Sequence, residues 1–356
     1  IFHEYNSETN KYKYEIVINF VNSRITKPYI TENDGSTKPM YPSDARLRNM
    51  SYSSSLFIDL EIIIWLNPMD EDKSLICKKG IKNINIGKIP IMVNSKYCLL
   101  KNNKQKDECE NDLGGYFIIN GNEKVIVGQD KIADNKVYVF LASKSNPKYS
   151  HIAEVKSCKE QGSNVSKNVS IKLLDKDNSF GKTMKISIPH VKIDIPIFIV
   201  FKALGITNDK EILKYILIDI KNKENEYLLH WLKPSIEEAS HINSQNEAIC
   251  YLLKQSLILG QPKDIKLSED KKIELYKEMI QRDLLPHCGP IFQKKALYLG
   301  YMVKKLAKCV FKQIKYDDRD SYCNKRVDCS GHLLSMLTRQ YVNKFIKDTR
   351  NTIMKE

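Results

Sequence analysis

The chain has 356 residues, 42% of them hydrophobic, and a formal net charge of +14. This length exceeds what one hydrophobic core usually holds and the composition is that of a globular protein, so we expect two domains. Apolar runs stay well short of the ~20 residues that a transmembrane helix needs, which excludes a membrane-spanning helix and predicts no membrane partner.

The first part of the chain is rich in predicted strands. Residues 14–21 and 56–66 are dominated by Ile, Val and aromatic residues, which favours two strands. Prolines 28, 39 and 42 mark the loop between them.

A predicted hairpin follows these strands. Residues 116–119 and 125–127 are apolar, β-prone runs that flank Asn120 and Gly121. Asn-Gly is the pair that most readily adopts the two positive φ angles of a tight hairpin turn. Glu123 and Lys124 come just past the apex, so the hairpin is expected to display a charge pair.

Later segments predict short strands and then helices. Strands are predicted at residues 151–155, 168–174 and 183–188, and helices at residues 198–204, 210–220, 294–315 and 331–350. The helix at 294–315 has a separate lysine face formed by Lys304, Lys308, Lys312 and Lys315. We interpret this face as the solvated side of a packed amphipathic helix rather than as a nucleic-acid stripe.

The positive charge is concentrated toward the end of the chain. Residues 1–140 carry 19 Lys and Arg against 18 Asp and Glu, residues 141–300 carry 25 against 19, and residues 301–356 carry 13 against 6. A local excess of cations favours a polyanionic partner, because each neutralised phosphate releases counterions. A lysine-rich solvated surface explains the excess equally well.

Motifs for stand-alone catalysis are absent from the sequence, including the phosphate-binding loop, the nucleophile elbow and the metalloprotease helix. Asp317, Asp318 and Asp320 are spaced like magnesium ligands. Arg319 lies among them, however, and would compete with a metal for the carboxylates. We therefore rank a magnesium-dependent phosphotransferase last among the functional hypotheses, behind the two that are given below.

Nine cysteines are scattered along the chain without a Cys-x-x-Cys pair. Structural zinc sites normally use closely paired ligands. The pattern predicts reduced thiols in an intracellular protein and no metal site.

Four stretches, in the same order and with similar gaps, carry a family resemblance. They are residues 42–52 (PSDARLRNMSY), 89–98 (IPIMVNSKYC), 114–129 (GGYFIINGNEKVIVGQ) and 317–328 (DDRDSYCNKRVD). Together they resemble the second-largest, β-like subunit of multisubunit DNA-directed RNA polymerases, in its eukaryotic, archaeal or large-DNA-virus form. Because the chain begins with Ile1 rather than Met, we expect it to be a fragment. The resemblance implies the N-terminal part of such a subunit, ahead of its fork, hybrid-binding and wall regions.

The resemblance implies an α+β fold with two mixed domains. Residues 1–144 would form a protrusion-like domain and residues 145–316 a lobe-like domain. Residues 317–356 would return to the protrusion and complete it with the C-terminal helix.

The resemblance also implies nucleic-acid contacts, with no catalytic residue in this chain. Lys124 matches a basic position beside the RNA–DNA hybrid, and Gln129 lies nearby. The other candidates match a loop that, in such subunits, lies close to a later region called the fork. They are Arg319, Lys325 and Arg326. Phosphate contacts of this kind fix the position of the backbone without reading its sequence.

A structural alternative stays open for the 317–328 segment. Its cations would pair with Asp318, Asp320 and Asp328 in a salt-bridge network, a reading that we favour for Arg319 and Asp320. Arg46 and Arg48 are expected to brace the start of the 56–66 strand.

The implied activity is nucleotidyl transfer by the assembled polymerase, in which Mg²⁺ is held mainly by the largest subunit. Implied partners are the DNA template, the RNA–DNA hybrid, the largest and other polymerase subunits, and initiation factors. The expected location is intracellular: the nucleus for a cellular eukaryote, and a cytoplasmic viral factory or the virion for a large DNA virus. The alternative is a non-catalytic nucleic-acid-binding or assembly module from a split subunit.

Two cysteines depart from the family pattern. Cys323 stands where glycine is commoner, and Cys329 where an apolar residue or glycine is usual. If Cys323 must adopt a positive φ, it does so under strain.

Overall fold

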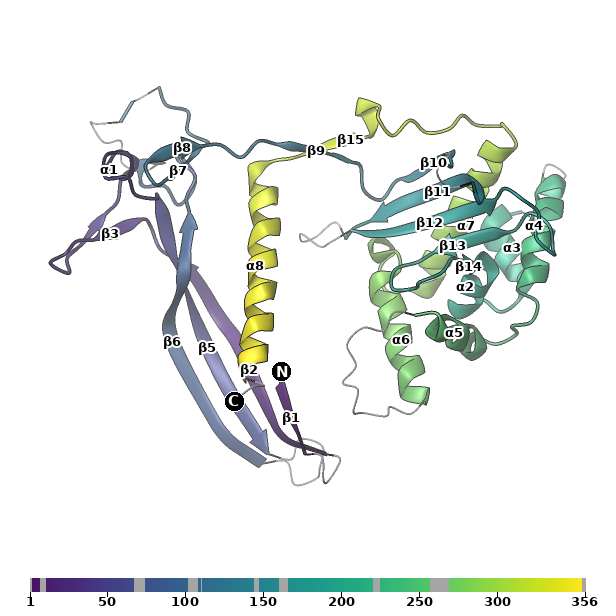
Figure 1. Ribbon diagram of the computed structural model, residues 1–356, viewed down its shortest axis with the longest axis horizontal. Helices are drawn as coiled ribbons and strands as arrows, with labels where there is room; N and C mark the ends of the chain where they lie inside the picture. Colours follow the sequence, from purple (N-terminus) through teal and green to yellow (C-terminus); the bar gives the residue numbers. More distant parts are fainter. Residues whose placement is uncertain are drawn as a thin grey trace. The chain divides into compact units, whose positions relative to one another are not determined.

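The computed structural model describes residues 2–6, 11–66, 74–101, 108–109, 111–143, 147–159, 166–219, 225–256 and 269–353 (Figure 1). The chain divides into two compact units, one formed by residues 1–128 and 329–356, the other by residues 129–328. Helices and sheets occur in both, so the α+β class is confirmed. The predicted boundary at residues 144–145 lies outside the described residues.

A four-stranded antiparallel sheet in the order β1-β2-β5-β6 forms part of the first unit. Its strands are β1 Phe2–Asn6, β2 Lys11–Ile25, β5 Ser53–Leu66 and β6 Ser74–Pro90. The strands predicted at 14–21 and 56–66 are confirmed within β2 and β5, which pair over most of their length. Strand β6 was not predicted, because exposed lysines, asparagines and glycines interrupt the apolar pattern of this edge strand.

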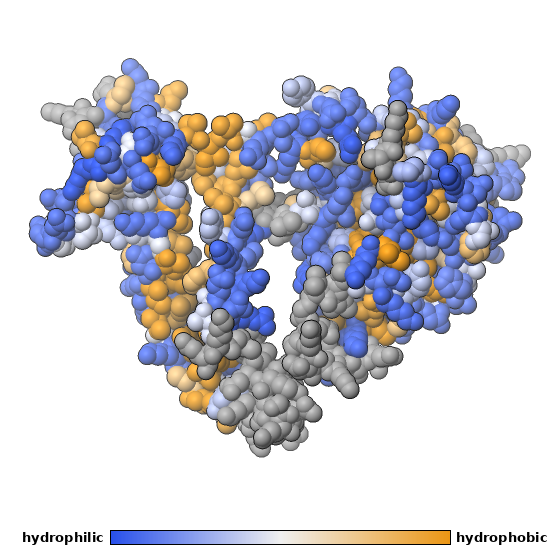
Figure 2. All heavy atoms as spheres, in the orientation of Figure 1, coloured by the Kyte–Doolittle hydropathy of each residue, from blue (hydrophilic) through white to orange (hydrophobic). Residues whose placement is uncertain are grey.

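Hydrophobic side chains remain at the surface along this sheet (Figure 2). Phe20 and Val21 of β2 are 52% and 57% exposed, and Leu75 and Ile76 of β6 are 49% and 51% exposed. These strands therefore bury only part of their apolar surface within the described chain.

A small core lies among the short elements of the first unit. These elements are β3 Tyr29–Thr31, β4 Thr37–Pro39, α1 Pro42–Leu47, a 3₁₀ turn at Leu99–Lys101, β7 Phe117–Ile119 and β8 Asn122–Lys124. Tyr52 and Ile118 are fully buried in this core, together with Ala45 of α1. Helix α1 starts with Pro42, at a position where the missing N–H leaves no hydrogen bond unmade.

The last element of the first unit is α8 Ser330–Ile353, which confirms the helix predicted at 331–350. None of its described side chains is buried. Leu337, Tyr341 and Phe345 recur at helical spacing and are 46–63% exposed. Such an apolar stripe is normally the packing face of an amphipathic helix.

The second unit is built on a five-stranded antiparallel sheet in the order β10-β11-β12-β13-β14. The strands are β10 Val137–Leu141, β11 Tyr149–Ser157, β12 Lys167–Leu174, β13 Met184–Ser187 and β14 Ile195–Pro196. They confirm the three strands predicted between residues 151 and 188. One row of side chains crosses the whole sheet in register and is completely buried: Val139, Ala153, Ile171, Ile186 and Ile195.

Six helices pack with this sheet around one core (Figure 1). They are α2 Ile197–Ala203, α3 Asp209–Leu217, α4 Glu226–Glu238, α5 Gln245–Lys254, α6 Glu269–Asp283 and α7 Phe292–Val310. Gly300 lets α7 approach α3 closely, because a Cβ at this position would lie 2.3 Å from the Tyr215 carbonyl oxygen. The predicted end of α7 at residue 315 was wrong: the helix stops at Val310, and Lys312 has a φ of +59°.

Two buried lysines close helix ends in this unit. Lys202 donates to the carbonyl oxygens of Ala239 and Ile242, just after α4. Lys295 donates to three carbonyl oxygens at the end of α6, those of Ile280, Gln281 and Leu284. Burial lowers the pKa of Lys295 to about 8. Both ammonium groups thus donate to carbonyl oxygens at or just after a helix end, where intrahelical partners run out.

Within the described parts of the chain, no helix combines the length and apolar composition that a bilayer crossing needs.

Candidate nucleic-acid interface

The Asn-Gly hairpin forms as a tight turn. Asn120 has a φ of +50° and Gly121 a φ of +77°, so both central residues are left-handed, as a two-residue hairpin requires. The first strand agrees with the prediction, but the second does not. It consists of Asn122–Lys124 rather than residues 125–127, because a two-residue turn sets Asn122 directly opposite Ile119.

The alternation of the second strand separates its two charges. Glu123 lies opposite the fully buried Ile118, and Lys124 lies opposite Phe117. Neighbouring residues of a strand point to opposite faces. Lys124 is exposed and forms no ion pair with any described residue. It is therefore a cation available to a partner.

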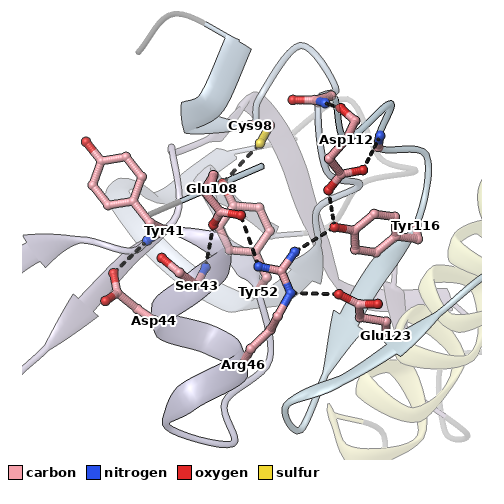
Figure 3. Close-up of polar contacts among 12 residues, drawn as sticks. Tyr41, Ser43, Asp44, Arg46, Tyr52, Cys98, Glu108, Asp112, Tyr116 and Glu123 are labelled. Atoms are coloured by element: carbon pink, nitrogen blue, oxygen red, sulfur yellow. Dashed lines mark hydrogen bonds and ion pairs between the residues drawn. The ribbon is translucent and has the colours of Figure 1, made fainter. Parts of the chain in front are cut away.

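Arg46 of α1 fixes the other face of the hairpin (Figure 3). Its Nε donates to Glu123 Oε1 at 2.7 Å, its Nη1 to Glu108 Oε2 at 3.1 Å, and its Nη2 to the Tyr116 hydroxyl at 2.6 Å. Burial by itself would lower the pKa of Arg46, but the hydrogen bonds to Glu108 and Glu123 outweigh this effect and raise the pKa. The guanidinium thus joins three segments of the first unit through three different nitrogen atoms.

The network continues beyond Arg46. Tyr116 donates its hydroxyl proton to the Asp112 carboxylate, and Glu108 also accepts from the Ser43 backbone N–H at 2.7 Å. Burial and the hydrogen bond to Asp112 raise the pKa of Tyr116 to about 12. The hydroxyl therefore stays protonated at neutral pH and can bridge Arg46 to Asp112.

Arg46 and Arg48 are structural, as predicted, but their predicted position at the start of the 56–66 strand was wrong. The hydrogen-bonding partners of Arg46 belong to the hairpin and to the chain before it, while Arg48 makes a two-point ion pair with Glu32 at 2.8 and 3.0 Å. None of these partners lies in β5.

The apex of the hairpin packs against the segment that directly follows α1. The Gly121 N–H donates to the Met50 carbonyl at 3.0 Å, and the Asn120 N–H to the Ser51 hydroxyl at 3.1 Å. A Cβ on Gly121 would lie 2.6 Å from Asn49 Oδ1 and 2.9 Å from Asn49 Cα. Glycine is required here both for its positive φ and for the close approach.

Four of the candidate residues meet in a two-stranded ribbon of the second unit. Strands β9 Gln129–Ile132 and β15 Lys325–Asp328 pair antiparallel, with Gln129 opposite Asp328 and Lys131 opposite Arg326. Gln129 and Arg326 are exposed. The ribbon therefore places a polar and a cationic side chain on one face.

Ion pairs neutralise part of the ribbon. Lys131 pairs with Asp328 at 3.1 Å, and Lys325 pairs with Asp130 at 3.6 Å. Arg326 instead donates to the carbonyl oxygen of Lys325 at 2.7 Å and to that of Cys323 at 3.3 Å. No described carboxylate pairs with Arg326, so its positive charge is not neutralised within the described chain and is available to a partner.

The segment before the ribbon runs along the edge strand β10. The Asp317 N–H donates to the Val139 carbonyl, and its carboxylate accepts from the Val139 N–H and from Lys305 at 2.7 Å. The Asp317 carboxylate therefore has a structural role, because it binds the end segment to strand β10 and helix α7. No described group of three or more Asp, Glu, His or Cys side chains could hold a metal ion. The magnesium phosphotransferase hypothesis therefore has no support in the described residues.

Arg319 makes its contacts with the sheet. Its guanidinium carbon lies 3.9 Å from the centre of the Phe140 ring, and its Nη1 lies 3.7 Å from Glu154 Oε2. Asp318 accepts from the Asp320 N–H at 2.9 Å. Among the described residues, neither of these two aspartates forms an ion pair. Of the three salt-bridge candidates, only Asp328 is paired, with Lys131.

Cys323 does not need a positive φ. It is the central residue of a 3₁₀ turn at Tyr322–Asn324 and is exposed. The Asn324 side chain below it is nearly buried and donates to the Asp318 carbonyl. A cysteine is therefore accommodated where the family commonly has glycine.

The candidates thus lie in three places. Gln129, Lys325, Arg326 and Asp328 come together in the ribbon, and Lys124 belongs to the other unit. Asp318, Arg319 and Asp320 belong to the segment that precedes the ribbon. Sequence reasoning missed Glu108, Tyr116 and Glu123 as partners of Arg46. They lie 62 to 77 positions away from it in the chain, and no local pattern links residues so distant.

Comparison with known proteins connects this geometry to a family. The sequence model of the RNA polymerase beta subunit family matches residues 3–356. DNA-directed RNA polymerase II subunit 2 of Arabidopsis thaliana is 36% identical over 350 residues, which is 95% of this chain and 28% of that protein. DNA-directed RNA polymerase II subunit RPB2 of Eremothecium gossypii is 37% identical over 356 residues, 94% of this chain and 28% of that protein.

An archaeal relative shows the same correspondence. DNA-directed RNA polymerase subunit Rpo2N of Methanococcus vannielii is 32% identical over 344 residues, which is 94% of this chain and 63% of that protein. The chain thus spans about 28% of the length of the eukaryotic relatives and 63% of the archaeal one. Because the family match covers the chain from residue 3 to its last residue, the chain belongs to the RNA polymerase beta subunit family.

Proposed function

We propose that this chain is the N-terminal part of the second-largest subunit of a DNA-directed RNA polymerase. In the assembled complex it serves nucleotidyl transfer by forming walls of the cleft that holds nucleic acid. The observation that carries this proposal is the match to the family over residues 3–356, with eukaryotic relatives above 35% identity. The exposed Lys124 on a firmly anchored hairpin supports it.

The two units correspond, in this proposal, to a protrusion and a lobe. The return of residues 329–356 to the unit of residues 1–128 supports a protrusion built from two separate parts of the chain. The apolar stripe of α8 supports the same assignment, because an amphipathic helix of this kind is stabilised mainly by packing.

Lys124 acts as a phosphate clamp on the RNA–DNA hybrid. An ammonium group without an intramolecular carboxylate can pair with phosphate without first breaking a salt bridge. Gln129, Lys325 and Arg326 supply further contacts from the ribbon. The stacking of Arg319 on Phe140, with Glu154 beside it, favours a structural role for that residue.

Catalysis belongs to other parts of the complex. The carboxylates of residues 317–320 do not fit a magnesium site, because Asp317 is held by Val139 and Lys305. The Mg²⁺ of the assembled enzyme is held mainly by the largest subunit. Partners are the template DNA, the hybrid, the other subunits and initiation factors, and in a eukaryotic cell the complex works in the nucleus.

Site-specific crosslinking tests this function. A photoreactive amino acid replaces Lys124 in the assembled polymerase, which is then placed on a template with labelled RNA. We expect a crosslink to the hybrid. The exposed Lys210 of α3 provides a control position in the other unit. Absence of any nucleic-acid crosslink from position 124 in an active complex would reject the clamp.

A second function has one supporting observation. The matched region makes up 63% of the archaeal relative but only 28% of the plant one, so the archaeal protein is less than half as long. A short chain of this family could act as a non-catalytic assembly module of a split subunit. Purification of the tagged native protein distinguishes the two, because a split subunit copurifies with a separate chain that supplies the missing part.

A further inference from the structure

The charge pair on the hairpin raises a physical problem for a phosphate clamp. Glu123 directly precedes Lys124, and its side chain is 56% exposed. A free carboxylate beside the ammonium group would attract it and lower the local positive potential. The hairpin can hold phosphate only if Glu123 is kept away from Lys124.

Strand alternation sets Glu123 and Lys124 on opposite faces of the hairpin, and Arg46 holds Glu123 on its own face. Its Nε–H donates to Glu123 at 2.7 Å and holds the carboxylate on the α1 side of the hairpin. Because side chains alternate along a strand, fixing Glu123 on this side directs Lys124 to the opposite one. The Asn-Gly turn adds to this constraint, since Gly121 rests on Asn49 and donates to the Met50 carbonyl.

We propose that Arg46 is the positioning residue for Lys124. It neutralises Glu123 and locks the hairpin in the orientation that presents the lysine. This inference rests on the proposed role of Lys124 as a phosphate clamp. We assign no nucleic-acid contact to Arg46 itself, because each of its three guanidinium nitrogens already donates to a residue of the first unit: Glu123, Glu108 or Tyr116.

The geometry requires arginine at this position. The guanidinium reaches its three partners with three nitrogen atoms in one plane, and a lysine ammonium offers only one. Glu108 shows how firmly the group is held, because its side chain is only 9% exposed and shares Arg46 with the hairpin. Arg46→Lys therefore retains the charge and loses the geometry.

The test uses the assembled polymerase that carries this chain. The half-life of its elongation complex is measured against salt concentration for Lys124→Met, Arg46→Lys and Glu123→Ala. Lys124→Met is expected to reduce the salt slope by about 1, the loss of one phosphate contact. Arg46→Lys and Glu123→Ala are expected to shorten the half-life several-fold and to reduce the slope in the same direction.

The sign of the Glu123→Ala effect is decisive. Removing a negative charge next to phosphate strengthens binding if electrostatics alone acts, whereas positioning predicts weaker binding. In the Lys124→Met background, Arg46→Lys and Glu123→Ala should cause no further loss. Glu32→Ala is the matched control, because it removes the carboxylate partner of Arg48 from the same unit without touching the hairpin.

The possible failures can be told apart. If Lys124→Met lowers the slope but the other two variants do not, the clamp stands and the positioning role is refuted. Additive losses in the double variants, or an equal loss in Glu32→Ala, also refute it, because they indicate a general loss of structure. An unchanged slope in Lys124→Met rejects the clamp and the positioning role together.

Discussion

Replacing Gly121 by valine tests whether the hairpin is seated on α1 as described. The substitution places a β-branched residue at a φ of +77°, which costs about 1–3 kcal/mol. The new Cβ would also lie 2.6 Å from Asn49 Oδ1 and 2.9 Å from Asn49 Cα, so backbone has to move. Overpacking of this kind costs a further ~1–3 kcal/mol, giving about 2–6 kcal/mol in total.

Gly115→Val is the matched control. Gly115 has a φ of +88°, but a Cβ there would meet nothing within 4 Å. Gly115→Val is therefore destabilised by the positive φ angle alone, without a steric clash of the new Cβ. The difference between the two variants isolates the contact between the hairpin and α1.

Amide hydrogen exchange in the assembled polymerase measures the effect locally. In the wild type, the Tyr52 N–H donates to the Ile118 carbonyl and the Gly121 N–H to the Met50 carbonyl. Both amides should exchange faster in Gly121→Val, and the increase should exceed that in Gly115→Val. Equal exchange of these amides in the wild type and Gly121→Val would refute the turn assignment and the close approach.

Three further outcomes are expected. Lys124→Glu should destabilise the elongation complex and flatten its salt dependence, and an unchanged slope counts against a phosphate contact. Lys295→Met should lower the free energy of unfolding by about 1–3 kcal/mol, because the carbonyl oxygens of Ile280, Gln281 and Leu284 lose the ammonium group as a donor. The folded-state pKa of Lys295, about 8, lies below its usual value of 10.5, so the unfolded chain binds more protons between these values. Stability of the wild type should therefore rise from pH 8 to 10.5, and denaturant titrations of Lys295→Met should lack this rise. Arg319→Gln should cost at most ~1 kcal/mol of stability and leave the salt slope of the elongation complex unchanged, since its partners are Phe140 and Glu154. A reduced slope would instead assign Arg319 to nucleic acid.

Local patterns predicted much of the secondary structure. The Asn-Gly pair defined the turn because Asn and Gly adopt the required positive φ angles more readily than other residues do. The register of β8 then follows from the length of the turn. The strands of the second unit and helix α8 were also predicted, since alternation and helical spacing are properties of neighbouring residues. Strand β6 was missed, because an edge strand needs no alternating apolar pattern.

The candidate site was predicted only in part. Lys124 could be found because it follows a recognisable turn and lies in a stretch that resembles the polymerase subunit. Arg46 was predicted to be structural, but its partners were placed at the wrong element. The sequence shows that an arginine is present, and only the fold shows which carboxylates surround it.

The sequence by itself determined the family, the hairpin that displays Lys124 and the elements whose apolar spacing is regular. These features depend on residues close together in the chain, where backbone geometry and side-chain period act directly. The tertiary structure alone decided that Arg46 pairs with Glu123, that Asp317 is bound by Val139 and Lys305, and that Arg319 stacks on Phe140. Each of these contacts forms only when distant segments pack together. Which residues pair is therefore determined by their distance in the folded chain and not by their spacing in the sequence.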